Sequence, residues 1–144
     1  MSDANEDQKK FWSGRGGDVW VQRQKAMDTM LNPLGEAALQ KLELNEDANV
    51  LDIGCGCGNT TFSIAEKIKP DGKVTGLDIS EPMLQRARQS ALKLSSENTS
   101  FQCVDVQTEN IGVNTFNAAF SRFGVMFFED SVAAFRNINR SLLP

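Results

Sequence analysis

A short glycine-rich stretch is the first feature of this sequence that could do chemistry. Residues 54–58 read Gly-Cys-Gly-Cys-Gly and follow directly on a nearly all-apolar run at residues 49–53. Such a run is typical of a strand that is buried on both faces of a parallel sheet. Glycines in the turn behind it permit positive φ and let a ligand touch the backbone without a Cβ in the way. A helix expected next would add free N–H groups and a partial positive charge, so the pattern predicts a turn that can hold a nucleotide-containing ligand.

Aspartates stand near the ends of three successive expected strands, at Asp52, Asp78 and Asp105. Asp52 lies just before the first glycine, where a carboxylate disfavours a pyrophosphate and suits an ammonium group. Asp78, about 20 residues after the loop, is in the position that accepts hydrogen bonds from ribose hydroxyls, and Ile79 beside it can pack on an adenine face. Asp105 can accept a hydrogen bond from an adenine amino group, while the backbone N–H of Val106 can donate to a ring nitrogen. Each acid alone is more often a helix cap or a solvated turn, but their order and spacing predict a nucleoside cofactor.

Missing residues exclude several other kinds of site. The dinucleotide motif Gly-x-Gly-x-x-Gly fails in both registers, because Asn59 and Thr61 occupy the place of its last glycine, and the Gly-Lys-Ser/Thr of a phosphate-binding loop is absent. The chain has no histidine and no tyrosine, which excludes a histidine general base, a histidine-ligated metal and a Ser-His-Asp triad. The three cysteines are too few for a structural zinc site, so no metal is expected.

Alternating helices and short apolar strands must position these residues, and this alternation is typical of an α/β fold with a parallel sheet. Asn32 and Pro33 are expected to separate the first two helices, because Asn suits a helix N-cap and Pro the first helical position. Helices are expected over residues 18–31, 33–42, 59–68, 81–94 and 130–143, and strands over residues 49–53, 73–77, 100–104 and 115–120.

Four stretches resemble the successive motifs of the class I S-adenosylmethionine-dependent methyltransferase family. They are residues 50–58, 76–84, 103–106 and 120–128. The closest similarity is to the subgroup of ubiquinone/menaquinone-pathway methyltransferases. Residues 12–20 of this chain also resemble the opening segment of that subgroup. The resemblance implies a Rossmann-like, doubly wound parallel sheet of order 3-2-1-4-5-7-6, with S-adenosylmethionine bound across the carboxyl ends of the first strands. It also implies methyl transfer to a small-molecule acceptor by in-line displacement.

The resemblance also implies a set of cofactor-binding residues. Met83 would pack near the adenosine, Ser121 and Arg122 would lie beside the methionine part and the methyl-transfer opening, and Trp20 would lie over the cofactor. No catalytic residue is named, because a sulfonium methyl is already electrophilic, alignment with the acceptor can supply several kcal/mol, and a base is needed only when the acceptor must lose a proton. The complete expected set is Asp52, Gly54, Cys55, Gly56, Cys57, Gly58, Asp78, Ile79, Met83, Asp105, Val106, Ser121, Arg122 and Trp20.

We expect three segments in the 144-residue chain. Residues 1–10 are polar and expected to be a mobile N-terminus, residues 11–45 a helical segment that covers the cofactor, and residues 46–144 the cofactor-binding half of a methyltransferase domain. The later strands of the family are absent, so we expect a fold truncated after the fourth strand and its helix. That fourth strand would be an apolar edge, which the rest of a longer protein or a partner would cover.

Composition limits the partners and the location. The net charge of −4 argues against nucleic acid as the main partner, because phosphate binding leaves a basic footprint. We expect no membrane span and no signal peptide, and the odd cysteine count suits the reducing cytoplasm. The expected acceptor is quinone-like, or another lipophilic molecule or metabolite. Two alternatives stay open, namely a catalytically silent cofactor-binding module and a nicotinamide-dependent oxidoreductase. The oligomeric state is not predicted.

Overall fold

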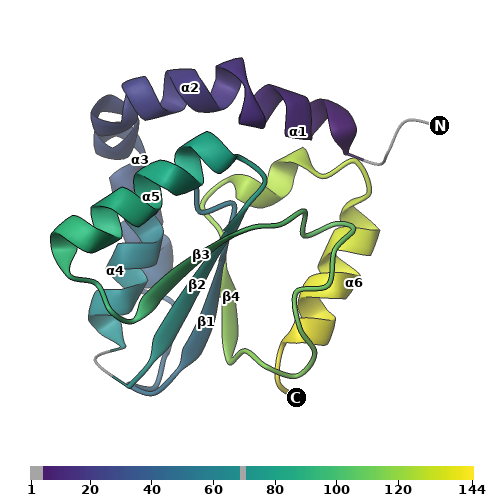
Figure 1. The fold of residues 1–144 in the computed structure, drawn as a ribbon. Helices are drawn as coiled ribbons and strands as arrows, with labels where there is room; N and C mark the ends of the chain where they lie inside the picture. Colours follow the sequence, from purple (N-terminus) through teal and green to yellow (C-terminus); the bar gives the residue numbers. More distant parts are fainter. Residues whose placement is uncertain (1–4, 69–70) are drawn as a thin grey trace.

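A parallel sheet with helices on both faces forms the framework of the computed structural model, which describes residues 5–68 and 71–144 (Figure 1). The strand order is β3-β2-β1-β4, and all three strand pairs are parallel. The strands are β1 (Asn49–Ile53), β2 (Lys73–Asp78), β3 (Thr99–Cys103) and β4 (Ala118–Phe120). The helices are α1 (Glu6–Ser13), α2 (Arg15–Gln22), α3 (Gln24–Leu39), α4 (Asn59–Lys67), α5 (Glu81–Leu94), the 3-10 helix η1 (Gly124–Phe127) and α6 (Ser131–Ser141).

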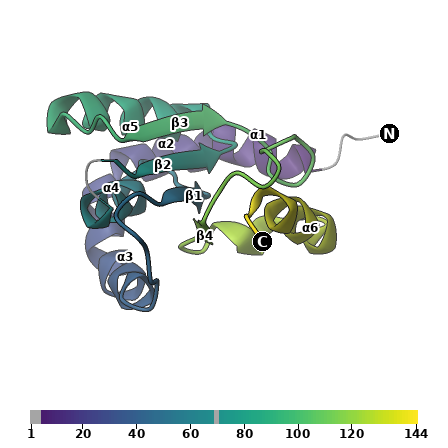
Figure 2. The same cartoon turned by 90° about the horizontal axis from the view of Figure 1, so that it is seen from below.

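The helices divide between the two faces of the sheet and its carboxyl end. Figure 2 shows α3, α4 and α5 on one side of the strands and α6 on the other. Helices α1 and α2 cross the end of the sheet where the strands finish, at the top of Figure 1. The predicted α/β fold, with a doubly wound parallel sheet, is therefore confirmed. Among the described residues β4 is the last strand and α6 the last helix, as predicted.

The core follows from the alternation of side chains along β1, the central strand. Val50 faces α4 and packs in a cluster with Ile64 and Val74, while Leu51 and Ile53 face α6 in a second cluster with Leu77 and Ile138. All of β1 after Asn49 is buried, as expected for a strand that is covered on both faces. One consequence is that Asp52 shares the face of Val50 and points toward α4.

Helix α3 differs from the prediction of two helices separated at Pro33. It runs without interruption over Gln24–Leu39 with Pro33 inside it, and the break lies earlier, at Arg23. The side chain of Asn32 explains why no helix starts there. Its Oδ1 accepts hydrogen bonds from Asn59 Nδ2 at 2.7 Å and from Arg122 Nη1 at 3.3 Å. The oxygen is thus engaged by α4 and the end of β4, and is not free to cap a new helix.

Two further segments differ from the sequence-based expectation. Residues 6–10, which we expected to be part of a mobile N-terminus, belong to α1, and Lys9 of this helix pairs with Asp105 at 3.2 Å. Residues 1–4 of that stretch lie outside the described residues. Strand β4 is shorter than expected. Phe116 does not pair with β1 but forms an isolated bridge with Leu142, the residue that follows α6. Within the described chain, no helix has both the length and the apolar character needed to cross a membrane.

The packing of α5 gives a paired test of this core. Leu84 is completely buried on α5, whereas Leu92 on the same helix is 82% exposed. We expect Leu84→Ala to lower the free energy of unfolding by about 2–5 kcal/mol, because it removes buried methyl groups and leaves a cavity. Leu92→Ala should change it by no more than about 0.5 kcal/mol. Urea denaturation followed by circular dichroism measures both, and equal losses for the two variants would show that α5 does not pack as described.

Candidate functional site

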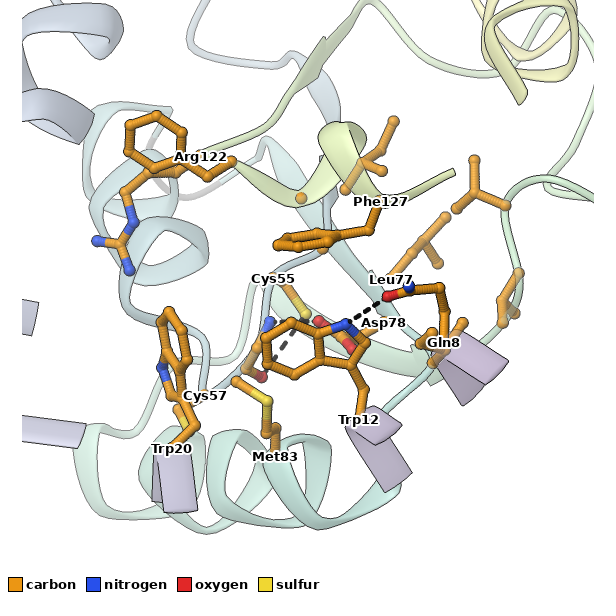
Figure 3. A pocket seen from close by; sticks show the side chains of 18 of the residues that line it. Gln8, Trp12, Trp20, Cys55, Cys57, Leu77, Asp78, Met83, Arg122 and Phe127 are labelled. Carbon is orange, nitrogen blue, oxygen red and sulfur yellow. Dashed lines mark hydrogen bonds between the residues drawn. The ribbon is translucent and has the colours of Figure 1, made fainter. Parts of the chain in front are cut away.

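A cavity of about 280 Å³ opens at the carboxyl end of the sheet, beneath α1 and α2 (Figure 3). The floor of the cavity is formed by the ends of β1 and β2 and by the glycine loop that follows β1 in the chain. Its walls come from α1, α2, α3, the start of α5, the segment after β3 and the segment around η1. Elements from both ends of the chain therefore meet at one pocket, at the sheet edge where the sequence predicted a ligand.

The glycine loop is fixed between β2 and η1. The N–H groups of Gly54 and Cys55 both donate to the carbonyl oxygen of Leu77, at 2.8 and 3.1 Å. Gly54 has a φ of +68°, and a Cβ there would lie 2.6 Å from Cα of Gly124. Gly56 has a φ of +55°, and its Cβ would lie 2.7 Å from Cε of Met83 in the pocket wall. A side chain at Gly54 would collide with the backbone of Gly124, and one at Gly56 would displace Met83 in the pocket wall.

Asp78 lies at the end of β2 with both carboxylate oxygens oriented by the backbone. Oδ2 accepts from the N–H of Gly56 at 2.8 Å, and Oδ1 accepts from the N–H of Ser80 at 2.9 Å. Burial raises the pKa of this carboxyl, although the backbone hydrogen bonds act in the opposite direction. Each oxygen keeps a further lone pair, so Asp78 can accept two more hydrogen bonds from a ligand in the pocket.

Asp105 also lines the pocket but is already engaged by the N-terminal helix. Its Oδ1 accepts from the N–H of Gln107 at 2.9 Å and from Nδ2 of Asn5 at 3.3 Å. Nζ of Lys9 lies 3.2 Å from its Oδ2. The carboxylate is buried, so α1 supplies the positive charge that compensates for its loss of water.

Asp52 does not line the pocket, although the sequence pattern placed it beside the ligand. It is fully buried beneath the loop, and its Oδ2 accepts from the hydroxyls of Thr60 and Thr61 at 2.6 and 2.7 Å. Burial is the largest influence on this carboxyl and raises its pKa to about 6, against the opposing effects of the two threonines and Arg122. The cause of this placement is the alternation along β1, which turns Asp52 toward the first turn of α4.

Two other residues of the expected set also lie outside the pocket wall. Gly58 has a φ of +89° and caps α4, where Phe62, Ala87 and Phe101 surround it. Ser121 Oγ donates to the carbonyl oxygen of Ile53 at 2.7 Å and accepts from the N–H of Gly124 at 3.1 Å. Ser121 thus holds the segment before η1 against β1. The remaining expected residues do line the pocket, namely Gly54, Cys55, Gly56, Cys57, Asp78, Ile79, Met83, Asp105, Val106, Arg122 and Trp20.

Several wall residues were not in the sequence-based set, and four of them are aromatic, namely Trp12, Phe123, Phe127 and Phe128. Trp12 projects into the centre of Figure 3, with its Nε1 donating to Oε1 of Gln8 at 3.1 Å. Its ring meets Trp20 edge to face at 5.9 Å and Phe127 at 5.3 Å. The tryptophans of the opening segment were a signal for this wall, since the resemblance included residues 12–20. Asp28 also lines the pocket, but nothing in the sequence distinguished this single acid on a helix as a site residue.

The two cysteines of the loop are poor nucleophiles in this setting. Burial raises the pKa of Cys57 to about 12 and the pKa of Cys55 well above its usual value. Both therefore stay protonated at neutral pH, and the thiolate is the reactive form. Across the described ranges, no group of three or more cysteine and acidic side chains is placed to hold a metal ion.

The burial of Asp52 predicts a pH dependence of stability. Its folded-state pKa of about 6 lies above that of the free carboxyl, so its contribution to stability is complete below about pH 4 and is lost as the pH rises through about 6. We expect Asp52→Asn, which can still accept from the threonine hydroxyls, to gain roughly 2–3 kcal/mol relative to the wild type between about pH 4 and 7.5. Urea denaturation at several pH values measures the difference. Stability curves that stay parallel would contradict a buried, perturbed Asp52.

Comparison with known proteins gives matches over most of the chain. The sequence profile of a family described as "Methyltransferase domain" matches residues 44–144. The chain is 33% identical over 102 residues to aklanonic acid methyltransferase DauC of Streptomyces sp. strain C5, a match covering 71% of this chain and 46% of the relative. It is 29% identical to demethylmenaquinone methyltransferase of Listeria monocytogenes over 106 residues, or 74% of this chain and 45% of the relative.

A solved structure extends the similarity to the fold with the cofactor present. Phosphoethanolamine N-methyltransferase 2 of Haemonchus contortus, in complex with S-adenosyl-L-methionine, superposes with a TM-score of 0.72 at 26% identity. The match covers 78% of this chain and 26% of that one. The chain spans less than half the length of the two curated relatives named above.

Proposed function

The chain belongs to the class I S-adenosylmethionine-dependent methyltransferase family, and we propose that it transfers the cofactor's methyl group to a small-molecule acceptor by in-line displacement. The observation that carries this proposal is the geometry around Asp78. Its carboxylate is held by the N–H groups of Gly56 and Ser80, next to a loop floor that has no side chain at Gly54 and Gly56. A ribose hydroxyl pair needs such a fixed double acceptor.

The charges of the pocket wall fit this cofactor. S-adenosylmethionine carries a sulfonium and an ammonium group against one carboxylate. The wall carries three carboxylates, at Asp28, Asp78 and Asp105, and one guanidinium, at Arg122. The rings of Trp12 and Trp20 add faces that attract a cation. The residues present therefore suit a ligand of net positive charge with a nucleoside at one end.

The proposed arrangement places the nucleoside across the ends of β2 and β3. Asp78 accepts from the ribose, Ile79 and Met83 pack on the adenosine, and Val106 contributes its backbone N–H to the adenine. Asp105 accepts from the adenine amino group, which would then share the carboxylate with Asn5 and Lys9. The loop from Gly54 to Cys57 carries the methionine part, with Trp20 above it. In this proposal residues 11–45 cover the cofactor and residues 46–144 bind it.

The chemistry asks the protein mainly for alignment. The bound cofactor supplies an electrophilic methyl group on its sulfonium. The chain's own residues fix the ligand and exclude water, through the glycine loop below and the rings of Trp12, Trp20 and Phe127 at the wall. Holding two reactants in line can lower a barrier by about 7–11 kcal/mol when the geometry is ideal. A hydroxylated acceptor must also lose its proton for the transfer to balance, and an acceptor that enters the pocket already ionised has released that proton to solvent, so it needs no histidine or tyrosine as a proton acceptor.

The aromatic wall also supports a planar, lipophilic acceptor. Phe123 and Phe127 line the pocket and remain 48% and 41% exposed, so they offer apolar area that the chain itself does not cover. Aromatic rings bind flat, apolar molecules by stacking and edge contacts. Two of the relatives are named for aklanonic acid and for demethylmenaquinone, a quinone. The cytoplasmic location expected from the sequence stays a prediction.

A catalytically silent cofactor-binding module is the alternative, and it shares every contact described above. Transfer itself separates the two. Incubation of the chain with S-adenosylmethionine that carries a labelled methyl group, together with a panel of hydroxylated quinones, should give labelled product if the chain is an enzyme. Tight cofactor binding without label transfer to any acceptor would favour the silent module.

Calorimetric titration tests the cofactor proposal through Asp78. We expect the 144-residue chain to bind S-adenosylmethionine and S-adenosylhomocysteine, but not NAD. Asp78→Asn should weaken both affinities by about tenfold or more, because an amide cannot accept as a charged group. Asp47→Asn, at an exposed turn away from the pocket, is the matched control and should leave both affinities unchanged.

Each failure has a distinct meaning. Absence of binding by the folded wild type would remove the proposed function. Unchanged binding by Asp78→Asn would remove only the assignment of Asp78 to the ribose.

A further inference from the structure

Two oppositely charged side chains meet in the pocket wall at the α3 side of the sheet, away from Asp105. Asp28 comes from α3, and Arg122 follows directly after β4. Arg122 Nη2 lies 3.6 Å from Asp28 Oδ1, and the two side chains are only 12% and 18% exposed. Figure 3 shows the guanidinium of Arg122 extending from the end of β4 toward the side of the pocket where Trp20 lies. Neither residue has a part in the ribose and adenine contacts proposed above.

The pair is loosely held for charges that are so little exposed. A guanidinium has five N–H donors, and those of Arg122 reach only Asn32 Oδ1 at 3.3 Å and Asp28 at 3.6 Å among the described residues. Strong charge-assisted bonds are about 2.7–2.9 Å long. Burial raises the pKa of Asp28 even though Arg122, Gln24 and Asn59 all act to lower it. Both charges therefore have capacity for a further, closer partner.

Asp52, the acid that the sequence assigned to an ammonium group, is not available for that purpose. Its carboxylate is fully buried below the loop and does not line the pocket. Oδ2 accepts from Thr60 and Thr61, and Oδ1, which has no partner among the described residues, is also enclosed by protein. Asp78 and Asp105 are committed to the nucleoside in the proposed arrangement. Asp28 is the remaining carboxylate of the described pocket wall, and Cys57 and Asn59 of the loop region line the wall with it.

We propose that Asp28 and Arg122 bind the amino-acid end of S-adenosylmethionine, with Asp28 accepting from its ammonium group and Arg122 donating to its carboxylate. This inference rests on the proposed function. The α-ammonium and the carboxylate of an amino acid are joined through one carbon, so their partners must lie side by side, as Asp28 and Arg122 do. Binding conserves charge, because the loose ion pair between Asp28 and Arg122 is replaced by two closer pairs, one with the ligand's ammonium group and one with its carboxylate.

The assignment gives the N-terminal helices a part in choosing the ligand. Asp28 lies outside residues 44–144, the range that the methyltransferase-domain profile matches. Helix α3 is anchored to that range by Asn32, which accepts from both Asn59 and Arg122. The same bonds hold Arg122 next to Asp28. The pair formed by Asp28 and Arg122 therefore depends on the continuity of α3 from Asp28 through Asn32.

Calorimetry with two ligands isolates this site. S-adenosylhomocysteine has the ammonium and carboxylate groups but no sulfonium, and 5′-methylthioadenosine lacks the amino-acid part. We expect Asp28→Asn to weaken S-adenosylhomocysteine binding by about tenfold or more, and methylthioadenosine binding by less than about twofold. Arg122→Gln should show the same contrast. Glu36→Gln, an exposed change on the same helix, is the control and should alter neither.

A measurement without substitution guards against a variant that fails to fold. In the wild type, the carboxyl carbon of Asp28, followed by NMR in carbon-13-labelled protein, should titrate at lower pH when S-adenosylhomocysteine is bound, because an ammonium partner stabilises the charged form. Methylthioadenosine should leave it unchanged. A titration that is the same with both ligands, or an equal loss of both affinities in Asp28→Asn, would overturn this inference. Neither result would affect the proposed function, which falls if the wild type binds neither ligand.

Discussion

The turn at the end of β1 is the constraint on which the rest of the structure depends. The chain must leave a buried central strand, reverse into α4 and pass within van der Waals distance of Gly124. It can do so because Gly54 and Gly56 have positive φ and no Cβ. The carbonyl oxygen of Leu77 fixes the turn by accepting from Gly54 and Cys55. The same turn brings the N–H of Gly56 to Asp78, so one backbone geometry both closes the loop and orients the acid next to it.

Sequence reasoning succeeded where a local pattern determines the structure. The apolar run at residues 49–53, the glycine loop and Asp78 are neighbours in the chain, and their relative placement follows from strand and turn geometry. The parallel order β3-β2-β1-β4 followed from the motif resemblance. Asp52 was misplaced because the pattern gives its alternation along β1 but not which helix covers that face. Helix α4 covers that face, and the hydroxyls of its threonines donate to Oδ2 of the buried carboxylate, while Oδ1 has no hydrogen-bond partner among the described residues.

The features that the sequence did not reveal depend on contacts between distant segments. Helix α3 continues through Pro33, and the side chain of Asn32 before it is held by Asn59 and Arg122, partners that are remote in sequence. The N-terminal helices were expected as a cover, but the contacts that seat them were not. Ser80 Oγ donates to the carbonyl oxygen of Trp12 at 2.6 Å, and Ser13 Oγ donates to that of Ile79 at 2.9 Å. These two bonds hold α1 against the segment that follows β2, and Trp12 of this helix lines the pocket.

In the proposed arrangement, the sheet and the N-terminal helices form the cofactor site together, with the nucleoside at the sheet end and the amino-acid part between α3 and β4. A crystal structure of the chain with S-adenosylhomocysteine tests this most directly. We expect electron density in the pocket, with both ribose hydroxyls within hydrogen-bonding distance of the Asp78 carboxylate and the amino-acid end between Asp28 and Arg122. Density for the ligand elsewhere on the molecule, or in the pocket with its ribose away from Asp78, would contradict this arrangement.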